Sequence, residues 1–171
     1  MSKLIAVWGS PFSGRTTFAV KLASVIYERY KSRVIVLHAD MQCPALPVLF
    51  PNYKAEDIFS VGEALSVAEI TQESVIRSLV TVKGKPNLAF LGFKDGENRY
   101  TYASFGSDKV HSLLDVLKSL ADFVLIDCTS SCDNPITETA LTEADQVIRL
   151  VTPDLKSMSF YASQLPLYAN A

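Results

Sequence analysis

The chain has 171 residues, of which 49% are hydrophobic, which is enough for one domain with a buried core. Sixteen basic and eighteen acidic residues give a net charge of −2, so nothing indicates a globally basic nucleic-acid binder. A local basic patch within this balanced total is still compatible with the composition. Every apolar run is far shorter than the roughly 18 residues of a membrane span. Three irregularly placed cysteines fit a reduced interior better than a disulfide framework. We therefore expect a cytoplasmic protein with no membrane segment and no direct nucleic-acid signal.

Short apolar segments that are rich in β-branched residues recur along the chain and are predicted to be strands. They are Lys3–Trp8, Arg33–His38, Asn87–Phe93, Asp122–Asp127 and Gln146–Val151. Their apolar residues do not alternate with polar ones, which is typical of strands buried on both faces of a parallel sheet. Helical patterns lie between them. This order predicts one α/β domain over residues 1–171, a doubly wound, mostly parallel sheet with helices on both faces.

Two of the predicted helices carry a clear apolar stripe. The stripe between the first two strands consists of Phe18, Leu22, Val25 and Ile26. The stripe before the fourth strand consists of Val110, Leu113, Leu114, Leu117 and Leu120.

Helix starts are indicated by capping residues at three places. Ser60 with Glu63 predicts a capping box, in which each residue bonds a free backbone N–H group of the other. Asn134 before Pro135 predicts an N-cap followed by the first helical position, and Thr152 before Pro153 predicts the same for the last helix.

The segment Gly9–Thr17, GSPFSGRTT, nearly matches the phosphate-binding pattern G-x-x-x-x-G-K-[ST] and lies between a strand and a helix, as such a loop requires. Backbone N–H groups of the loop and the positive end of the helix would bind phosphate oxygens, and the Thr16 hydroxyl would bind Mg²⁺. An ordinary turn that contains two glycines is the alternative. The expected nucleotide-binding residues are Gly9, Ser10, Pro11, Phe12, Ser13, Gly14, Arg15, Thr16 and Thr17.

The fourth predicted strand ends in an acidic residue, Asp127, as a Walker B strand does. In a parallel sheet Asp127 would lie at the carboxyl edge beside the loop and hold Mg²⁺ through water. The alternative is an aspartate that caps a turn. Together and in this order, the two motifs predict a Mg²⁺ site made by Thr16 and Asp127.

Four segments in this order resemble the ParA/MinD family of P-loop ATPases, of the SIMIBI class. They are GSPFSGRTT, VIVLHADMQCP, FVLIDCTS and ADQVIRLVTPDLKSM. The resemblance spans nearly the whole chain and implies ATP and Mg²⁺ as ligands, and a homodimer or a partner protein. It also implies that Asp40 is catalytic and positions the hydrolytic water, whereas His38 occupies a place that is acidic in the family.

Three departures from the family pattern bear on activity. An early lysine of the family loop is Ser10 here, and the P-loop lysine is Arg15, whose planar guanidinium differs from a compact ammonium. The chain ends where the family has a further strand with an adenine-reading asparagine, so we expect a shortened chain or a domain without the family's last strand and helix. Because the transition state needs positive charge where negative charge develops, we expect nucleotide binding with slow hydrolysis and Arg15 as the remaining catalytic cation.

Two other functions stay open at this point. A pseudo-ATPase would keep the fold and act as an interaction scaffold with no turnover, and a small-molecule kinase or ligase would need an acceptor pocket that no segment indicates. Cys128 and Cys132 do not have a metal-binding spacing, so Cys128 is expected to be a buried strand-end thiol. His38 is interpreted as a core or loop histidine, and a functional role beside the expected Mg²⁺ site is the alternative.

Overall fold

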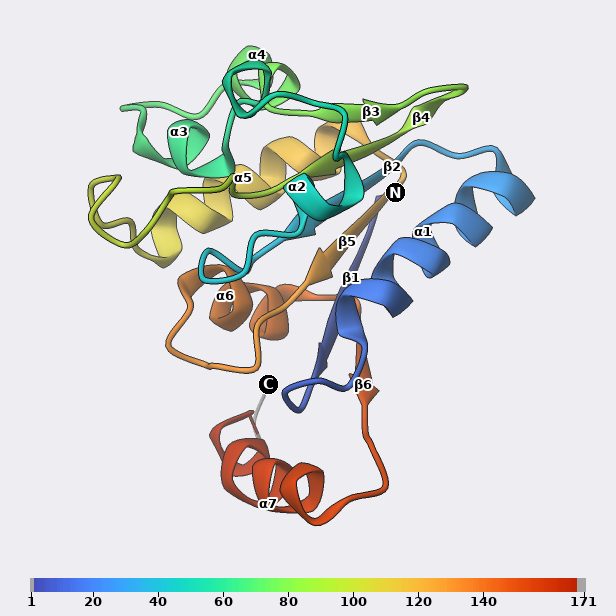
Figure 1. Cartoon of the computed structure of the whole chain (residues 1–171), viewed down its shortest axis with the longest axis vertical. Helices are drawn as coiled ribbons and strands as arrows, with labels where there is room; N and C mark the ends of the chain where they lie inside the picture. Colours follow the sequence, from blue (N-terminus) through green and yellow to red (C-terminus); the bar gives the residue numbers. More distant parts are fainter. Residues whose placement is uncertain (1, 169–171) are drawn as a thin grey trace.

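The computed structural model describes residues 2–168 and contains a six-stranded sheet with helices on both faces (Figure 1). The strand order is β3-β4-β2-β5-β1-β6, and every neighbouring pair is parallel except β3 with β4. The strands are β1 Lys3–Gly9, β2 Val34–His38, β3 Val80–Val82, β4 Lys85–Leu91, β5 Phe123–Asp127 and β6 Gln146–Leu150. The predicted fold class, a doubly wound and mostly parallel sheet, is confirmed.

The helices divide between the two faces of the sheet. They are α1 Arg15–Tyr30, α2 Leu46–Leu49, α3 Val61–Ser66, α4 Gln72–Arg77, α5 Ser107–Leu120, α6 Pro135–Glu143 and α7 Leu155–Gln164. Helices α1 and α2 share one core with one face of the sheet, whereas α3 to α7 share a second core with the other face. Helix α7 lies beyond the carboxyl end of β6, at the bottom of Figure 1. Among residues 2–168, no helix is long and apolar enough to cross a bilayer.

All five predicted strands are present with small shifts at their ends, and one strand was missed. Strand β3 has three residues and forms an antiparallel hairpin with β4. Gly84 in the connecting turn has φ +79°, a conformation that favours glycine. A three-residue strand gives too little periodicity to be predicted from the sequence.

The predicted apolar stripe of α1 is wrong at two positions. Phe18 and Val25 are 37% and 50% exposed, and the helix instead buries Ala19, Ala23 and Ile26. The small alanines let the helix backbone approach the sheet closely. The stripe of α5 is confirmed, since four of its five predicted residues are fully buried and Leu120 packs partly buried against the same core.

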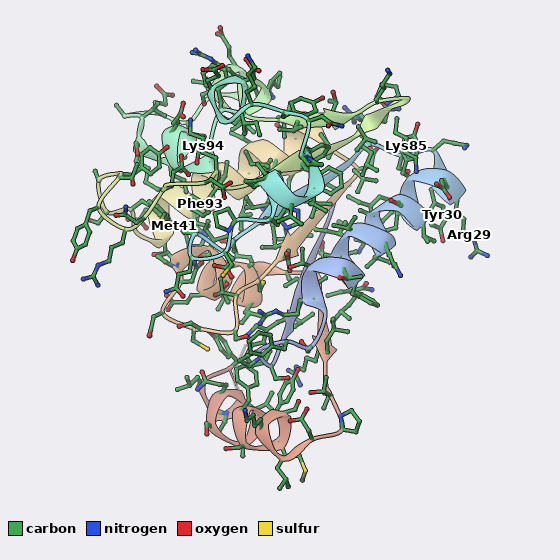
Figure 2. All side chains as sticks on the ribbon, viewed as in Figure 1. Arg29, Tyr30, Met41, Lys85, Phe93 and Lys94 are labelled. Carbon is green, nitrogen blue, oxygen red and sulfur yellow. The ribbon has the colours of Figure 1, made fainter. Side chains whose placement is uncertain are left out.

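The cap of α3 is half of the predicted capping box. Ser60 is the N-cap, and its Oγ accepts a hydrogen bond from the backbone N–H of Gly62 at 3.0 Å. Glu63 does not return a bond to Ser60; its carboxylate pairs with the Nζ of Lys94 at 2.8 Å. Lys94, labelled in Figure 2, lies on the segment after β4. The ion pair therefore joins α3 to the segment that follows β4.

The caps of α6 and α7 differ in outcome. Asn134 caps α6 as predicted, because its Oδ1 accepts from the N–H of Thr137 at 3.0 Å. The prediction of Thr152 as the cap of the last helix is wrong. Asp154 is the N-cap of α7 and accepts from the N–H of Ser157 at 2.8 Å, since a carboxylate two residues later satisfies the first turn.

Trp8 attaches α7 to the end of the sheet. The indole is 1% exposed and lies 5.3 Å from the ring of Phe160, 5.5 Å from Tyr161 and 5.7 Å from Tyr168, measured between ring centroids. The contacts with Tyr161 and Tyr168 are edge-to-face and the contact with Phe160 is tilted, and such aromatic packing adds to the burial of apolar area. Because Trp8 immediately precedes the glycine-rich loop, this packing also places α7 next to the loop.

We predict that Leu114→Ala destabilises the protein by about 2–5 kcal/mol, because it removes a fully buried side chain from the core between α5 and the sheet. The matched control is Leu155→Ala on α7, where the same side chain is 82% exposed and the expected change is within about 0.5 kcal/mol. Urea unfolding measures both. Equal losses of stability at the two positions would contradict the described core.

Candidate functional site

The carboxyl ends of β1, β5 and β2 lie side by side at one edge of the sheet. Asp127 is in register with Val7 on one side and with His38 on the other. The N–H of Cys128 donates to the carbonyl of Val7, and the N–H of Ala39 donates to the carbonyl of Asp127, both at 3.0 Å. These bonds bring the glycine-rich loop after β1 and the acidic end of β5 to the same place, as the sequence predicted from parallel strands.

The loop between β1 and α1 keeps its amide groups free. Its one internal backbone bond runs from the N–H of Ser13 to the carbonyl of Ser10 at 3.2 Å. Within residues 2–168, the N–H groups of Gly14–Thr17 donate to no protein atom. They stand at the positive end of α1, a helix of 16 residues, which is the usual arrangement for binding an anion.

Two residues of this loop have a left-handed backbone. Gly14 has φ +81°, which glycine adopts without strain. Phe12 has φ +62° and its side chain is fully exposed, so this residue takes a backbone conformation that costs about 1–2 kcal/mol for a residue with a Cβ. The loop therefore keeps this conformation although the backbone at position 12 would suit glycine better than phenylalanine. Pro11 is exposed beside it.

Arg15 lies across the loop. Its Nη1 donates to the carbonyl of Gly9 at 2.7 Å and to the Oγ of Ser130 in the segment after β5. Burial lowers the pKa of Arg15, while the negative charges of Asp127 and Asp40 oppose this shift. The guanidinium therefore joins the start of the loop to the segment that follows Asp127.

Ser10, at the place of the family's early lysine, is buried at 2% exposure. Its Oγ is hydrogen bonded to the Oγ of Ser157 in α7 at 3.0 Å. The Ser157 hydroxyl also accepts from the N–H of Thr152 at 3.2 Å. The buried side chain of Ser10 thus connects the loop to α7 and does not face solvent.

Asp127 is a buried carboxylate with one oxygen in use. The residue is 5% exposed, and its Oδ2 accepts from the Nδ1 of His38 at 2.8 Å. Its Oδ1 has no hydrogen-bond partner among the described residues, and neither has the buried Oγ of Ser13. Buried oxygens without a donor are rare, and hard oxygen ligands are what Mg²⁺ prefers. The half-buried Thr16 in the first turn of α1 adds a hydroxyl, so these donors are of the kind that Mg²⁺ prefers.

Asp40 follows β2 and forms a turn. Its Oδ1 accepts from the N–H of Gln42 at 2.8 Å and from the N–H of Cys43 at 3.0 Å. The residue is partly exposed, and its negative charge opposes the lowering of the Arg15 pKa by burial. In this conformation the carboxylate of Asp40 stabilises the turn after β2 at the same edge of the sheet.

The two cysteines near Asp127 are placed differently, one buried in the core and the other beside α7. Cys128 is 2% exposed, and burial raises the pKa of its thiol, so it is the buried strand-end thiol that was expected. The Sγ of Cys132 donates to the Oε1 of Gln164 in α7 at 3.0 Å. The part of the chain that the structure describes has no group of three or more histidine, cysteine or acidic side chains that could hold a metal ion.

Sequence reasoning missed the contacts that connect the loop to distant segments. The Arg15–Ser130 bond joins residues 115 positions apart, and the Ser10–Ser157 bond joins residues 147 positions apart. A cavity of about 430 Å³ lies between the segment after β5 and α7. Its walls are Ser130, Ser131, Cys132, Asp133, Phe160, Gln164 and Leu167. No local pattern signals such contacts, because they depend on how the segment after β5 and α7 pack against the loop.

The sheet order, the loop before α1 and the acidic end of β5 together define a P-loop ATPase fold of the ParA/MinD type. Residues 9–165 match the family AAA_31, described as an AAA domain, and the chain belongs to this family.

Individual relatives agree with this assignment. The chain is 26% identical, over 164 residues, to a protein of Emiliania huxleyi named for the septum site-determining protein MinD, covering 92% of this chain and 55% of that protein. The solved structure of MinD complexed with Mg-ADP from Pyrococcus horikoshii is 17% identical and superimposes with a TM-score of 0.75 over 99% of this chain and 66% of that chain.

A ParA family ATPase from Chlorobium tepidum is 13% identical, with a TM-score of 0.79 over 99% of this chain and 69% of that chain. The chain therefore spans about two thirds of the length of these solved structures and 55% of the curated relative. At these identities the likeness to the solved structures shows the fold alone.

We predict that Gly9→Ala disturbs the pairing of β1 with β6, because a Cβ at this position would lie 2.4 Å from the carbonyl oxygen of Leu150. Overpacking against a backbone atom costs about 1–3 kcal/mol. Gly106→Ala is the control, since a Cβ at that position meets no atom within 4 Å and its φ is −99°.

Hydrogen exchange of the β6 amides measures the local effect. Faster exchange in β6 is expected for Gly9→Ala and not for Gly106→Ala. Unchanged exchange in both variants would mean that the close approach of Gly9 to Leu150 is not a constraint on the loop.

Proposed function

We propose that this protein is a nucleotide-dependent switch that binds ATP with Mg²⁺, hydrolyses it slowly, and acts by pairing with itself or with a partner protein. One observation carries the proposal: N–H groups at the start of α1 and the Oδ1 of the buried Asp127 lie at the same edge of the sheet, and none of them has a partner within residues 2–168. A phosphate group would accept hydrogen bonds from the N–H groups, and a divalent cation would bind the Oδ1 of Asp127.

The loop would bind phosphate mainly through its backbone. The N–H groups of Gly14–Thr17 and the dipole of α1 do not depend on the side chain at position 15, so the change from lysine to arginine leaves them in place. The hydroxyl of Thr16 and the Oδ1 of Asp127 would hold Mg²⁺, which neutralises charge on the outer phosphates. A protein of similar fold, the cobyrinic acid a,c-diamide synthase of Mycobacterium smegmatis, has a solved structure with bound ADP and magnesium.

Slow hydrolysis follows from what the charged and polar side chains do in this conformation. Arg15 is bonded to Gly9 and Ser130, Ser10 is bonded to Ser157, and Asp40 caps a turn. Losing one well-placed electrostatic donor typically costs about 10²–10³ in rate, and two of the usual lysines are absent. Arg15 is the catalytic cation that remains, and Asp40 is the residue proposed to position water.

Pairing is supported by apolar side chains around the loop. Phe12 at the tip of the loop is fully exposed, Val151 after β6 is 62% exposed, and Leu155 and Met158 on α7 are 82% and 65% exposed. The β1–β6 pairing and the Ser10–Ser157 bond bring these segments together. The single domain that we propose would therefore meet its partner near the nucleotide.

A pseudo-ATPase scaffold is the second candidate function. The engagement of Ser10 and Arg15 in bonds inside the protein favours it, because both side chains would have to move before they could act on a phosphate. The two candidates differ in turnover and not in fold.

The test separates binding from hydrolysis. Calorimetric titration of the protein with ADP and with ATP is expected to give binding that strengthens when Mg²⁺ is added. Asp127→Asn is expected to remove most of that gain, because it removes the negative charge that attracts the cation. Absence of binding for both nucleotides, with and without Mg²⁺, would contradict the proposal.

Hydrolysis is then measured in the wild-type protein and in Arg15→Lys. The account expects slow turnover in the wild type and a rise on the order of 10-fold or more in Arg15→Lys, since a lysine restores a donor that can follow the transferred phosphate. Nucleotide binding without turnover in both proteins would favour the scaffold. Turnover in the wild type as fast as in an ordinary P-loop ATPase would show that the guanidinium already has the role of the lysine.

A further inference from the structure

His38 is a buried polar side chain for which the proposed function gives no role. The residue is 1% exposed at the end of β2, and its ring stacks on Phe90, which belongs to the core shared with α1 and α2. Its position is acidic in the ParA/MinD pattern. We propose that His38 is a positioning residue for Asp127: it holds the Oδ2 of the carboxylate so that the Oδ1 is presented to Mg²⁺. This inference rests on the proposed function.

The bond between the two side chains has a defined direction. The Nδ1 of His38 lies 2.8 Å from the Oδ2 of Asp127, and the two residues are paired in the register of β2 with β5. An ionised carboxylate only accepts hydrogen bonds, so the ring donates from Nδ1. The Nε2 has no partner among the described residues. The histidine therefore uses its one bond within the protein to hold Asp127.

Packing fixes the plane of the imidazole ring. The ring of Phe90 stacks on it with centroids 5.9 Å apart and planes 7° apart. On the neighbouring segment, a Cβ at Gly92 would come within 3.1 Å of the Cβ of His38, so the absence of a side chain there leaves room for the histidine. A ring held in this way presents its N–H in one direction, which in turn fixes the rotation of the Asp127 carboxylate.

The bond to His38 leaves one oxygen of Asp127 for a metal ion. Because Oδ2 accepts from His38, the remaining oxygen is Oδ1, which is buried and has no partner in residues 2–168. Groups that hydrogen bond to metal-binding side chains orient them, and their loss typically costs about 10–100-fold in metal affinity. A carboxylate at position 38 would place two like charges next to each other, whereas an imidazole N–H attracts Asp127.

A purely structural histidine makes a different prediction. If the bond between His38 and Asp127 served only to stabilise the fold, its loss would lower stability and change nucleotide affinity equally with and without Mg²⁺. A positioning role instead affects the part of the affinity that depends on the metal.

The test compares two substitutions of different kinds. His38→Phe keeps a ring against Phe90 and removes the donor, whereas His38→Asn keeps an N–H group at the place of Nδ1. ADP affinity is measured with Mg²⁺ and with EDTA at one pH. His38→Phe is expected to lower the Mg²⁺-dependent gain about 10–100-fold and to leave the affinity in EDTA unchanged. His38→Asn is expected to keep most of the gain.

The same substitution in an Asp127→Asn background completes a double-mutant cycle, in which His38→Phe is expected to have no further effect. The inference is overturned if His38→Phe keeps the full Mg²⁺ gain, if it loses affinity equally in EDTA, or if His38→Asn is as impaired as His38→Phe. A wild-type protein that binds no ADP overturns the proposed function and the inference with it, and this failure is recognised because it occurs without any substitution.

Phe90→Leu is the second variant, should His38→Phe not fold. It removes the stacked ring and leaves both members of the hydrogen bond in place. A smaller loss of the Mg²⁺-dependent gain is expected, because the imidazole can then rotate. An unchanged gain in Phe90→Leu overturns the claim that the orientation of the ring determines how Asp127 meets the metal.

Discussion

The parallel pairing of β1, β5 and β2 is the constraint on which the site depends. Because these strands run in one direction, the loop after β1, Asp127 and His38 all emerge at the same edge of the sheet. The close approach of Gly9 to the carbonyl of Leu150 adds β6 to this edge, and β6 leads directly into α7. The edge therefore contains free amides, a buried carboxylate and a helix that contacts the loop, and none of these would meet if the strands were antiparallel.

The two residues of the glycine-rich loop that differ from the family pattern both form hydrogen bonds inside the protein. Ser10 bonds Ser157 of α7, and Arg15 bonds Ser130 in the segment after β5. Both bonds run from the loop to segments that also line the cavity of about 430 Å³. If a bound phosphate attracted the guanidinium, the bond to Ser130 would have to break, which would couple occupancy of the loop to the position of the segment after β5. The proposed switch would use this coupling.

The sequence predicted those features that depend on local pattern. Five strands and the buried stripe of α5 follow from runs of apolar residues, and the loop and Asp127 follow from motif and strand order. The stripe of α1 was predicted wrongly, because phenylalanine and valine suggest burial whereas the close packing of this helix selects Ala19 and Ala23. The contacts of Ser10 and Arg15 could not be predicted, because their partners lie more than a hundred positions away and are set by tertiary packing.

A crystal structure of the protein grown with ADP and Mg²⁺ tests the central claim most directly. The account predicts phosphate oxygens within about 3.2 Å of the N–H groups of Gly14–Thr17, with Mg²⁺ beside the hydroxyl of Thr16 and the Oδ1 of Asp127. It also predicts that Oδ2 of Asp127 keeps its bond to His38. A loop without nucleotide at saturating ADP, or a nucleotide bound away from α1 with Asp127 uninvolved, would contradict it.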